Sequence, residues 1–149
     1  MRIALAACAL ALVASTPALA GEAHADINAG LGWTDGLPSK VVAGGSVGYD
    51  MGFGPAFVGV EESITKVLAS DSDARWGTSV RVGTLVTPGT KLYATAGYNY
   101  GSGPDGTDLG AGIEHGFGPL YGRVEYKHYF NGDGAADSNA ATVGVGIHF

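Results

Sequence analysis

Cysteine is nearly absent from the chain, and its absence excludes several kinds of site. The single cysteine, Cys8, lies in a stretch that we interpret as a secretory signal peptide. Arg2 gives this stretch a positive start, residues 3–13 are apolar, and residues 18–20 read Ala-Leu-Ala, a typical cleavage site. With the signal peptide 1–20 removed after Ala20, the domain 21–149 has no disulfide, no thiolate nucleophile and no cysteine-ligated metal.

Positive charge is scarce as well. The chain has 8 Lys and Arg residues against 14 Asp and Glu residues, and its net charge is −6. An acidic chain without a basic patch is not expected to bind nucleic acid. Long apolar runs and helical periodicity are also missing from residues 21–149, so neither a membrane-spanning helix nor a helical domain is expected there.

Glycine, by contrast, is abundant, and apolar residues recur at every second position. All 26 glycines lie after residue 20. The period of two is the signature of β-strands. It recurs in eight segments, at 27–33, 41–49, 56–60, 76–86, 92–98, 109–113, 120–126 and 141–149. An even number of strands with no segment left for a helix predicts an all-β fold, an eight-stranded antiparallel up-and-down barrel.

The connections between the predicted strands alternate in length. Tight turns are expected at 51–54, 87–90 and 116–118, and longer polar loops at 34–40, 66–74, 101–106 and 131–139. Short turns at one end and longer loops at the other are typical of a transmembrane barrel of the bacterial outer membrane, with the turns on the periplasmic side. The predicted location is therefore the outer membrane, with its lipid and lipopolysaccharide as surroundings.

The sequence Gly-Phe-Gly-Pro occurs twice, at 52–55 and at 116–119, an offset of 64 residues. An advance of 64 residues corresponds to four strands, or half of an eight-stranded circuit. The two copies are therefore predicted to form turns on opposite sides of the barrel rim. Glycine supplies the positive φ of such a turn, and Pro55 and Pro119 are expected to open the strand that follows.

The two faces of the predicted strands differ in chemistry. We expect the valine, leucine, isoleucine and alanine face, together with the aromatic residues, to contact lipid. Aromatic residues near the water interfaces are Trp33, Tyr49, Trp76, Tyr98 and Tyr126. The other face is rich in glycine and carries an expected ion-pair network inside the lumen, formed by Glu61, Arg81, Glu114, Arg123, Glu125 and Lys127.

Two details of these faces are further expectations. Gly83 and Gly146 face the lumen and should accept a small polar residue better than leucine. Glu62 breaks the alternation and would point to lipid, where an acid is costly. We therefore expect it to lie above the apolar band, or a β-bulge to turn it inward.

The segment Leu120–Phe130, LYGRVEYKHYF, followed by the closing strand ATVGVGIHF, resembles the outer-membrane beta-barrel domain family, which includes opacity-type and porin-like small proteins. The likeness rests on Arg123, Glu125, Tyr126, Lys127 and the terminal Phe149. It implies that Phe149 is part of a signal read by the barrel-assembly machinery. The family includes adhesins, porin-like proteins and structural barrels.

No arrangement of residues predicts catalysis, a metal or a cofactor. The histidines, at positions 24, 115, 128 and 148, lack metal-ligand spacing. Lipid A deacylase barrels carry His-x-Ser-Asn on a late strand, and the matching string here is His128-Tyr129-Phe130-Asn131. Phe130 replaces the serine, so acyl transfer has no nucleophile.

The leading hypothesis is a non-catalytic outer-membrane barrel, structural or porin-like, with a lumen filled by side chains. One alternative is a surface adhesion or interaction module that binds a host or envelope partner through its extracellular loops. The other is a soluble periplasmic barrel that binds a small apolar ligand inside.

Overall fold

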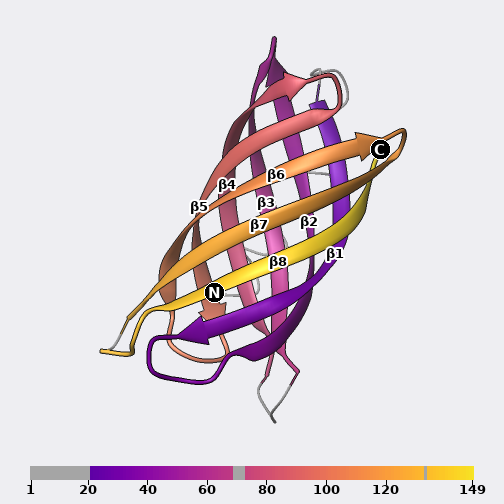
Figure 1. Cartoon of the computed structure of the whole chain (residues 1–149). Helices are drawn as coiled ribbons and strands as arrows, with labels where there is room; N and C mark the ends of the chain where they lie inside the picture. Colours follow the sequence, from indigo (N-terminus) through magenta and orange to yellow (C-terminus); the bar gives the residue numbers. More distant parts are fainter. Residues whose placement is uncertain (1–20, 69–72, 133) are drawn as a thin grey trace.

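The computed structural model describes residues 21–68, 73–132 and 134–149; the predicted signal peptide lies outside these residues. They form eight strands, labelled in Figure 1: β1 (Gly21–Thr34), β2 (Lys40–Phe53), β3 (Ala56–Val67), β4 (Arg75–Thr87), β5 (Thr90–Gly101), β6 (Gly106–Phe117), β7 (Leu120–Asn131) and β8 (Ser138–His148). Within the described residues, no helix is long and apolar enough to cross a membrane.

The strands form one closed antiparallel barrel in which each strand pairs with its neighbours in sequence and β1 pairs with β8. The tight turns between β2 and β3, β4 and β5, and β6 and β7 gather at the upper end in Figure 1. The longer loops gather at the lower end. The predicted up-and-down barrel of eight strands is confirmed, and we refer below to its turn end and its loop end.

The repeated Gly-Phe-Gly-Pro segments form the β2–β3 and β6–β7 turns, four strands apart around the barrel. Gly54 and Gly118 have φ values of 66° and 71°. Each is followed by proline, whose φ is fixed near −65°, so the signs match a type II′ hairpin turn. Pro55 and Pro119 are thus the second residue of each turn. The expectation that they open the next strand was wrong by one position, because Ala56 and Leu120 begin the strands.

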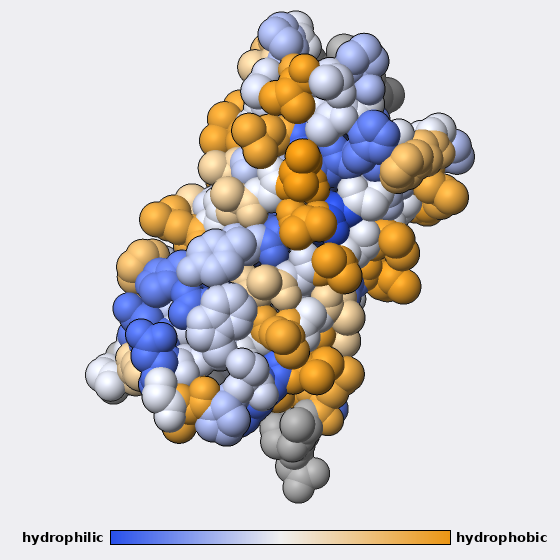
Figure 2. Space-filling model, in the orientation of Figure 1, coloured by the Kyte–Doolittle hydropathy of each residue, from blue (hydrophilic) through white to orange (hydrophobic). Residues whose placement is uncertain are grey.

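The outer wall of the barrel is apolar. Side chains such as Val80, Val124 and Val143 are 51%, 53% and 62% exposed, and Figure 2 shows hydrophobic side chains along the face turned to the viewer. The buried positions are mostly polar or charged. This is the reverse of a water-soluble barrel, which places apolar side chains inside.

Not all aromatic residues follow the apolar face, which corrects the sequence interpretation. Phe57, Tyr93 and Tyr121 are 2%, 3% and 1% exposed, and all three lie inside the barrel. Each faces a glycine on the neighbouring strand, and His24 does the same: the pairs are Phe57–Gly83, Tyr93–Gly112, Tyr121–Gly146 and His24–Gly48. Large rings fill a lumen of this width only where the facing residue has no side chain.

The space over these glycines is already occupied. A Cβ atom added to Gly146 would lie 2.4 Å from the ring of Tyr121, and one added to Gly83 would lie 2.4 Å from the carbonyl oxygen of Leu92. Any side chain at Gly83 or Gly146 would therefore require neighbouring atoms to shift, and the expectation that a small polar residue is accepted better than leucine stays a prediction. The high glycine content reflects the room that interior rings need.

Glu62 lies on the outer face, opposite Val47 on β2 and Thr78 on β4, in a register without a bulge. The β-bulge explanation is therefore wrong. The residue is nevertheless only 8% exposed. The Thr78 hydroxyl lies 2.7 Å from both carboxylate oxygens, and the Tyr100 hydroxyl donates at 3.5 Å. Neighbouring side chains thus solvate a carboxylate that strict alternation directs outward.

Candidate functional site

The candidate site is the charged interior of the barrel. Because side chains alternate along each strand, the odd-numbered residues of β3, β4 and β7 point toward the axis. All six residues predicted to form the lumen network are buried, with exposures of 0–9%. These are Glu61, Arg81, Glu114, Arg123, Glu125 and Lys127. We use "lumen network" for these residues and the side chains that bind them.

Glu61 joins the two arginines at the centre of the lumen network. Its Oε2 atom accepts from Nη1 of Arg81 at 3.1 Å and from Nη1 of Arg123 at 2.7 Å. Nε2 of His24 lies 3.4 Å from the same oxygen. Since Glu61, Arg81 and Arg123 come from three strands, these contacts extend across the interior instead of along one wall.

Arg81 is fully buried and has three carboxylate neighbours. Besides Glu61, Nη2 donates to Glu114 at 3.2 Å, and Nε lies 3.4 Å from Asp50. Its guanidinium carbon lies 4.3 Å from the ring centroid of Tyr93, a cation–π contact. Several counter-charges and an aromatic ring offset the cost of burying this cation.

Arg123 connects the centre to β1 and β2. Its Nη1 lies 3.1 Å from Asp26, and its Nη2 donates to the Ser46 hydroxyl at 3.2 Å. Asp26 also accepts from Ser46 at 2.6 Å, from Tyr121 at 3.0 Å and from Asn28 at 3.1 Å. These donors hold the Asp26 carboxylate in a fixed position inside the lumen.

The remaining predicted pair lies nearer the loop end. Nζ of Lys127 is 3.5 Å from Glu125, whose other oxygen accepts from the Tyr93 hydroxyl at 2.8 Å. Because the Tyr93 ring also contacts Arg81, this pair is linked to the centre. The three predicted acids and three predicted bases are all paired within the described residues.

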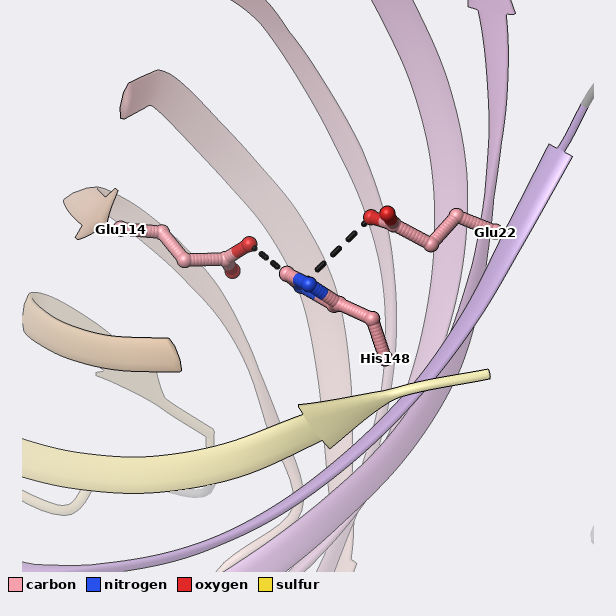
Figure 3. A group of neighbouring side chains, drawn as sticks. All are labelled: Glu22, Glu114 and His148. Carbon is pink, nitrogen blue, oxygen red and sulfur yellow. Dashed lines mark hydrogen bonds and ion pairs between the residues drawn. The ribbon is translucent and has the colours of Figure 1, made fainter. Parts of the chain in front are cut away.

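A second cluster lies toward the turn end, where His148 sits between Glu22 and Glu114 (Figure 3). Its Nε2 atom is 3.0 Å from Glu114 and 3.5 Å from Glu22. Ligand atoms of these three residues lie within 4.8 Å of one another, a spacing that a metal ion could use. Lys91 binds the same oxygens, at 3.5 Å from Glu114 and in direct contact with Glu22. Its ammonium group already binds these carboxylates, so a metal ion would have to displace it.

Sequence reasoning missed several titratable residues in the described part of the interior. Five of them are buried or half-buried and bind the predicted residues: His24, Asp26, Asp50, Lys91 and His148. The alternation that placed Glu61 inside would have found them, because they share the parity of the inward residues on β1, β2, β5 and β8.

The five predicted interface aromatics lie on the outer face. Trp76, Tyr98 and Tyr126 are 41%, 49% and 45% exposed, and Trp33 lies 6.2 Å from Tyr126 by ring centroids. These four are near the loop end, whereas Tyr49 is nearer the turn end.

Phe149 continues β8 by one residue at the turn end. Its backbone N–H and carbonyl pair with Ala23 at 2.9 Å and 3.0 Å. Its side chain is 72% exposed. The backbone of Phe149 is thus held by β1 while its ring is exposed.

The described part of the barrel interior includes two adjoining cavities. The larger, which we call the vestibule, has a volume of about 340 Å³ at the loop end, and its lining includes Trp33, Leu37, Val42, Val67, Arg75 and Tyr129. Beneath it, a cavity of about 30 Å³ is lined in part by Arg123, Glu125 and Lys127. The smaller cavity has room for about two water molecules. The open space therefore narrows sharply where the lumen network begins.

No family model and no curated protein matches the sequence, but solved structures share its architecture. Neisserial surface protein A superposes with a TM-score of 0.60 over 87% of this chain and 97% of its own, at 13% identity. The attachment invasion locus protein Ail of Yersinia pestis gives 0.60 over 87% and 99%, at 18% identity. The barrel domain of Pseudomonas aeruginosa OprF gives 0.54 over 85% and 97%, also at 18%.

The fold is that of a small outer-membrane β-barrel. Each superposition covers nearly the whole of the other barrel, and designed transmembrane β-barrels match as well, with a TM-score of 0.54. At sequence identities of 13–18%, these similarities show a shared fold and nothing about function. The function must therefore be argued from the residues of this chain.

Proposed function

We propose that this protein is a structural barrel of the bacterial outer membrane, non-catalytic and closed by its own side chains. The observation that carries the proposal is the pair of arginines, Arg81 and Arg123, that meet at Glu61 in the middle of the lumen. Eight strands leave an interior just wide enough for side chains to fill. A network anchored on several strands closes that interior to solutes.

The apolar outer wall and the polar interior support placement in a membrane. Lipid would surround the exposed valine and leucine side chains, and the aromatic residues near both ends would lie at the water interfaces. The signal peptide, the lipopolysaccharide surroundings and recognition of Phe149 by the barrel-assembly machinery belong to the same proposal. Membrane fractionation with a heat-modifiability gel tests this placement. Recovery as a water-soluble periplasmic protein would contradict it and support the soluble ligand-binding barrel.

Single-channel current in planar bilayers tests the closed lumen. The wild type should conduct weakly or not at all. Arg123→Ala should raise the current, because Arg123 lines the small cavity beneath the vestibule, and its truncation would extend that cavity. The matched control is Arg75→Ala, in the vestibule above the lumen network, which should leave the current unchanged. A large, steady wild-type current would favour a diffusion pore instead.

Interaction through the loops is the second candidate function. Between the strands the four loops contain six aspartates and no lysine, arginine, histidine or glutamate. Ail has been solved in complex with the heparin analogue sucrose octasulfate, but acidic loops would repel such a polyanion. A partner of this chain would therefore be cationic. Binding of heparin to cells that display the protein would refute this charge argument.

A further inference from the structure

The vestibule at the loop end contains a cation that the lumen network does not use. We propose that the vestibule binds a small amphipathic carboxylate, with its acidic group at Arg75 and its apolar body against the walls. This binding site is separate from the closed lumen. A ligand would reach it from the loop end of the barrel without passing the lumen network.

Arg75 differs from the other arginines of the barrel in its partners. Arg81 and Arg123 each contact at least two carboxylates. Nη2 of Arg75 donates to two neutral oxygens, the Pro104 carbonyl and the Asn131 side chain, each at 3.1 Å. Its Nε is buried without an acceptor among the described residues, a feature that it shares with Arg81 and Arg123. Among the described residues Arg75 makes no salt bridge, so an arriving carboxylate would be its first contacting anion.

The surroundings of Arg75 suit the apolar part of such a ligand. Its guanidinium carbon lies 5.0 Å from the Tyr129 ring centroid. Leu37, Val42 and Val67 contribute apolar walls. A volume of about 340 Å³ is at the lower end of the range of small-molecule sites. Apolar walls with one well-placed cation are typical of a site for a small amphipathic anion.

The residues at the bottom and at the opening of the vestibule further restrict the kind of ligand that it can bind. Lys127 and Glu125 lie beneath the vestibule, next to the small cavity, so a ligand would bind there and not pass through. Lys40 and Asp73 also line the vestibule and have opposite charges, while Asp105 and Asp108 lie close enough to Arg75 to interact with its charge. The six loop aspartates disfavour anions of high charge. The ligand is therefore expected to carry a single negative charge.

Calorimetric titration of the detergent-folded protein tests the proposal with 2-naphthoate as the probe and neutral 2-naphthamide as its matched control. The wild type should bind naphthoate saturably and at least about tenfold more tightly than the amide, as expected for one charge-assisted contact. Arg75→Gln should weaken naphthoate binding by about tenfold or more and leave the amide unchanged. Arg75→Lys should retain part of the preference.

A second variant tests the location independently of charge. Val67→Phe narrows the vestibule and should weaken both probes, whereas Leu120→Phe on the outer wall at the turn end should weaken neither. A heat-modifiability gel checks that each variant is folded. Absence of saturable naphthoate binding, equal affinity for the amide, or unchanged binding in Arg75→Gln would overturn the proposal. Because conductance is measured separately, failure here leaves the closed-lumen proposal to its own test.

Discussion

Replacement of Arg81 with methionine is expected to lower the free energy of unfolding by about 3 kcal/mol. Methionine keeps much of the volume but removes the charge, the contacts to Glu61, Glu114 and Asp50, and the stacking on Tyr93. Removal of one partner from a buried ion pair typically costs about 3–5 kcal/mol, because it leaves a buried charge without compensation.

The lower end of that range follows from the partners that remain. Without Arg81, Glu61 keeps Arg123 at 2.7 Å, and Glu114 and Asp50 keep Lys91 at 3.5 Å and 3.3 Å. No carboxylate loses its last cation. Arg123→Met should cost more, nearer about 5 kcal/mol, because Asp26 would then keep only hydroxyl and amide donors among the described residues.

Both variants are measured by denaturant unfolding in detergent, followed by tryptophan fluorescence and by gel mobility. Arg75→Met is the control, because Arg75 has no carboxylate partner among the described residues, and it should change stability by less than about 1 kcal/mol. If Arg81→Met stays within about 1 kcal/mol of the wild type, the lumen network does not stabilise the barrel and the reasoning is refuted.

Three further outcomes follow from the walls, the interior and the end of the barrel. Val80→Arg, on the outer wall at mid-strand, should cost about 2–4 kcal/mol in lipid, whereas Leu120→Arg beside a turn should cost about 0–1 kcal/mol; equal costs would place the membrane elsewhere. Gly112→Ala should destabilise the barrel because its Cβ would lie 2.5 Å from the Tyr93 ring, and Tyr93→Leu in the same chain should recover part of the loss in a denaturation series; no recovery would mean that the ring is not the obstacle. Deletion of Phe149 should lower the folded, membrane-inserted fraction in a fractionation assay without lowering export, and unchanged insertion would remove its assembly role.

The period of two, together with the alternation of short turns and longer loops, was sufficient to predict the fold. The lengths of the connections and the composition of the two faces placed the apolar side chains outside, and Val80 and Val143 lie there. The period of two also placed Glu61, Arg81 and Arg123 on the same side of their strands. Alternation gives the face of a residue but not its partner, because partners depend on strand order, register and side-chain reach. The sharing of Glu61 between two arginines could therefore not be predicted.

The errors have separate origins. Aromatic residues were assigned to the outer face because aromatic girdles are typical of such barrels. Alternation alone puts Phe57 on the inward face of β3 with Glu61, and Tyr93 on the inward face of β5 with Lys91. The glycines that give these rings room could not be foreseen, because they depend on the register of two strands together. The vestibule was also missed. Arg75 lies just before the segment 76–86, in which the period of two was recognised, so its side chain was not assigned to a face.

The rings that face glycines also restrict how the strands can pair during assembly. A slip that keeps each face must shift a strand by two residues. Such a slip between β3 and β4 would set Phe57 against Arg81 or Leu85 instead of Gly83, and a slip between β1 and β2 would set His24 against Ser46 or Asp50 instead of Gly48. Phe57 and His24 thus face a glycine in only one of these three alignments, whereas a slip by two residues would still set Tyr93 against Gly110 or Tyr121 against Gly144. The register of β3 with β4 and of β1 with β2 is therefore restricted by two positions that have no side chain.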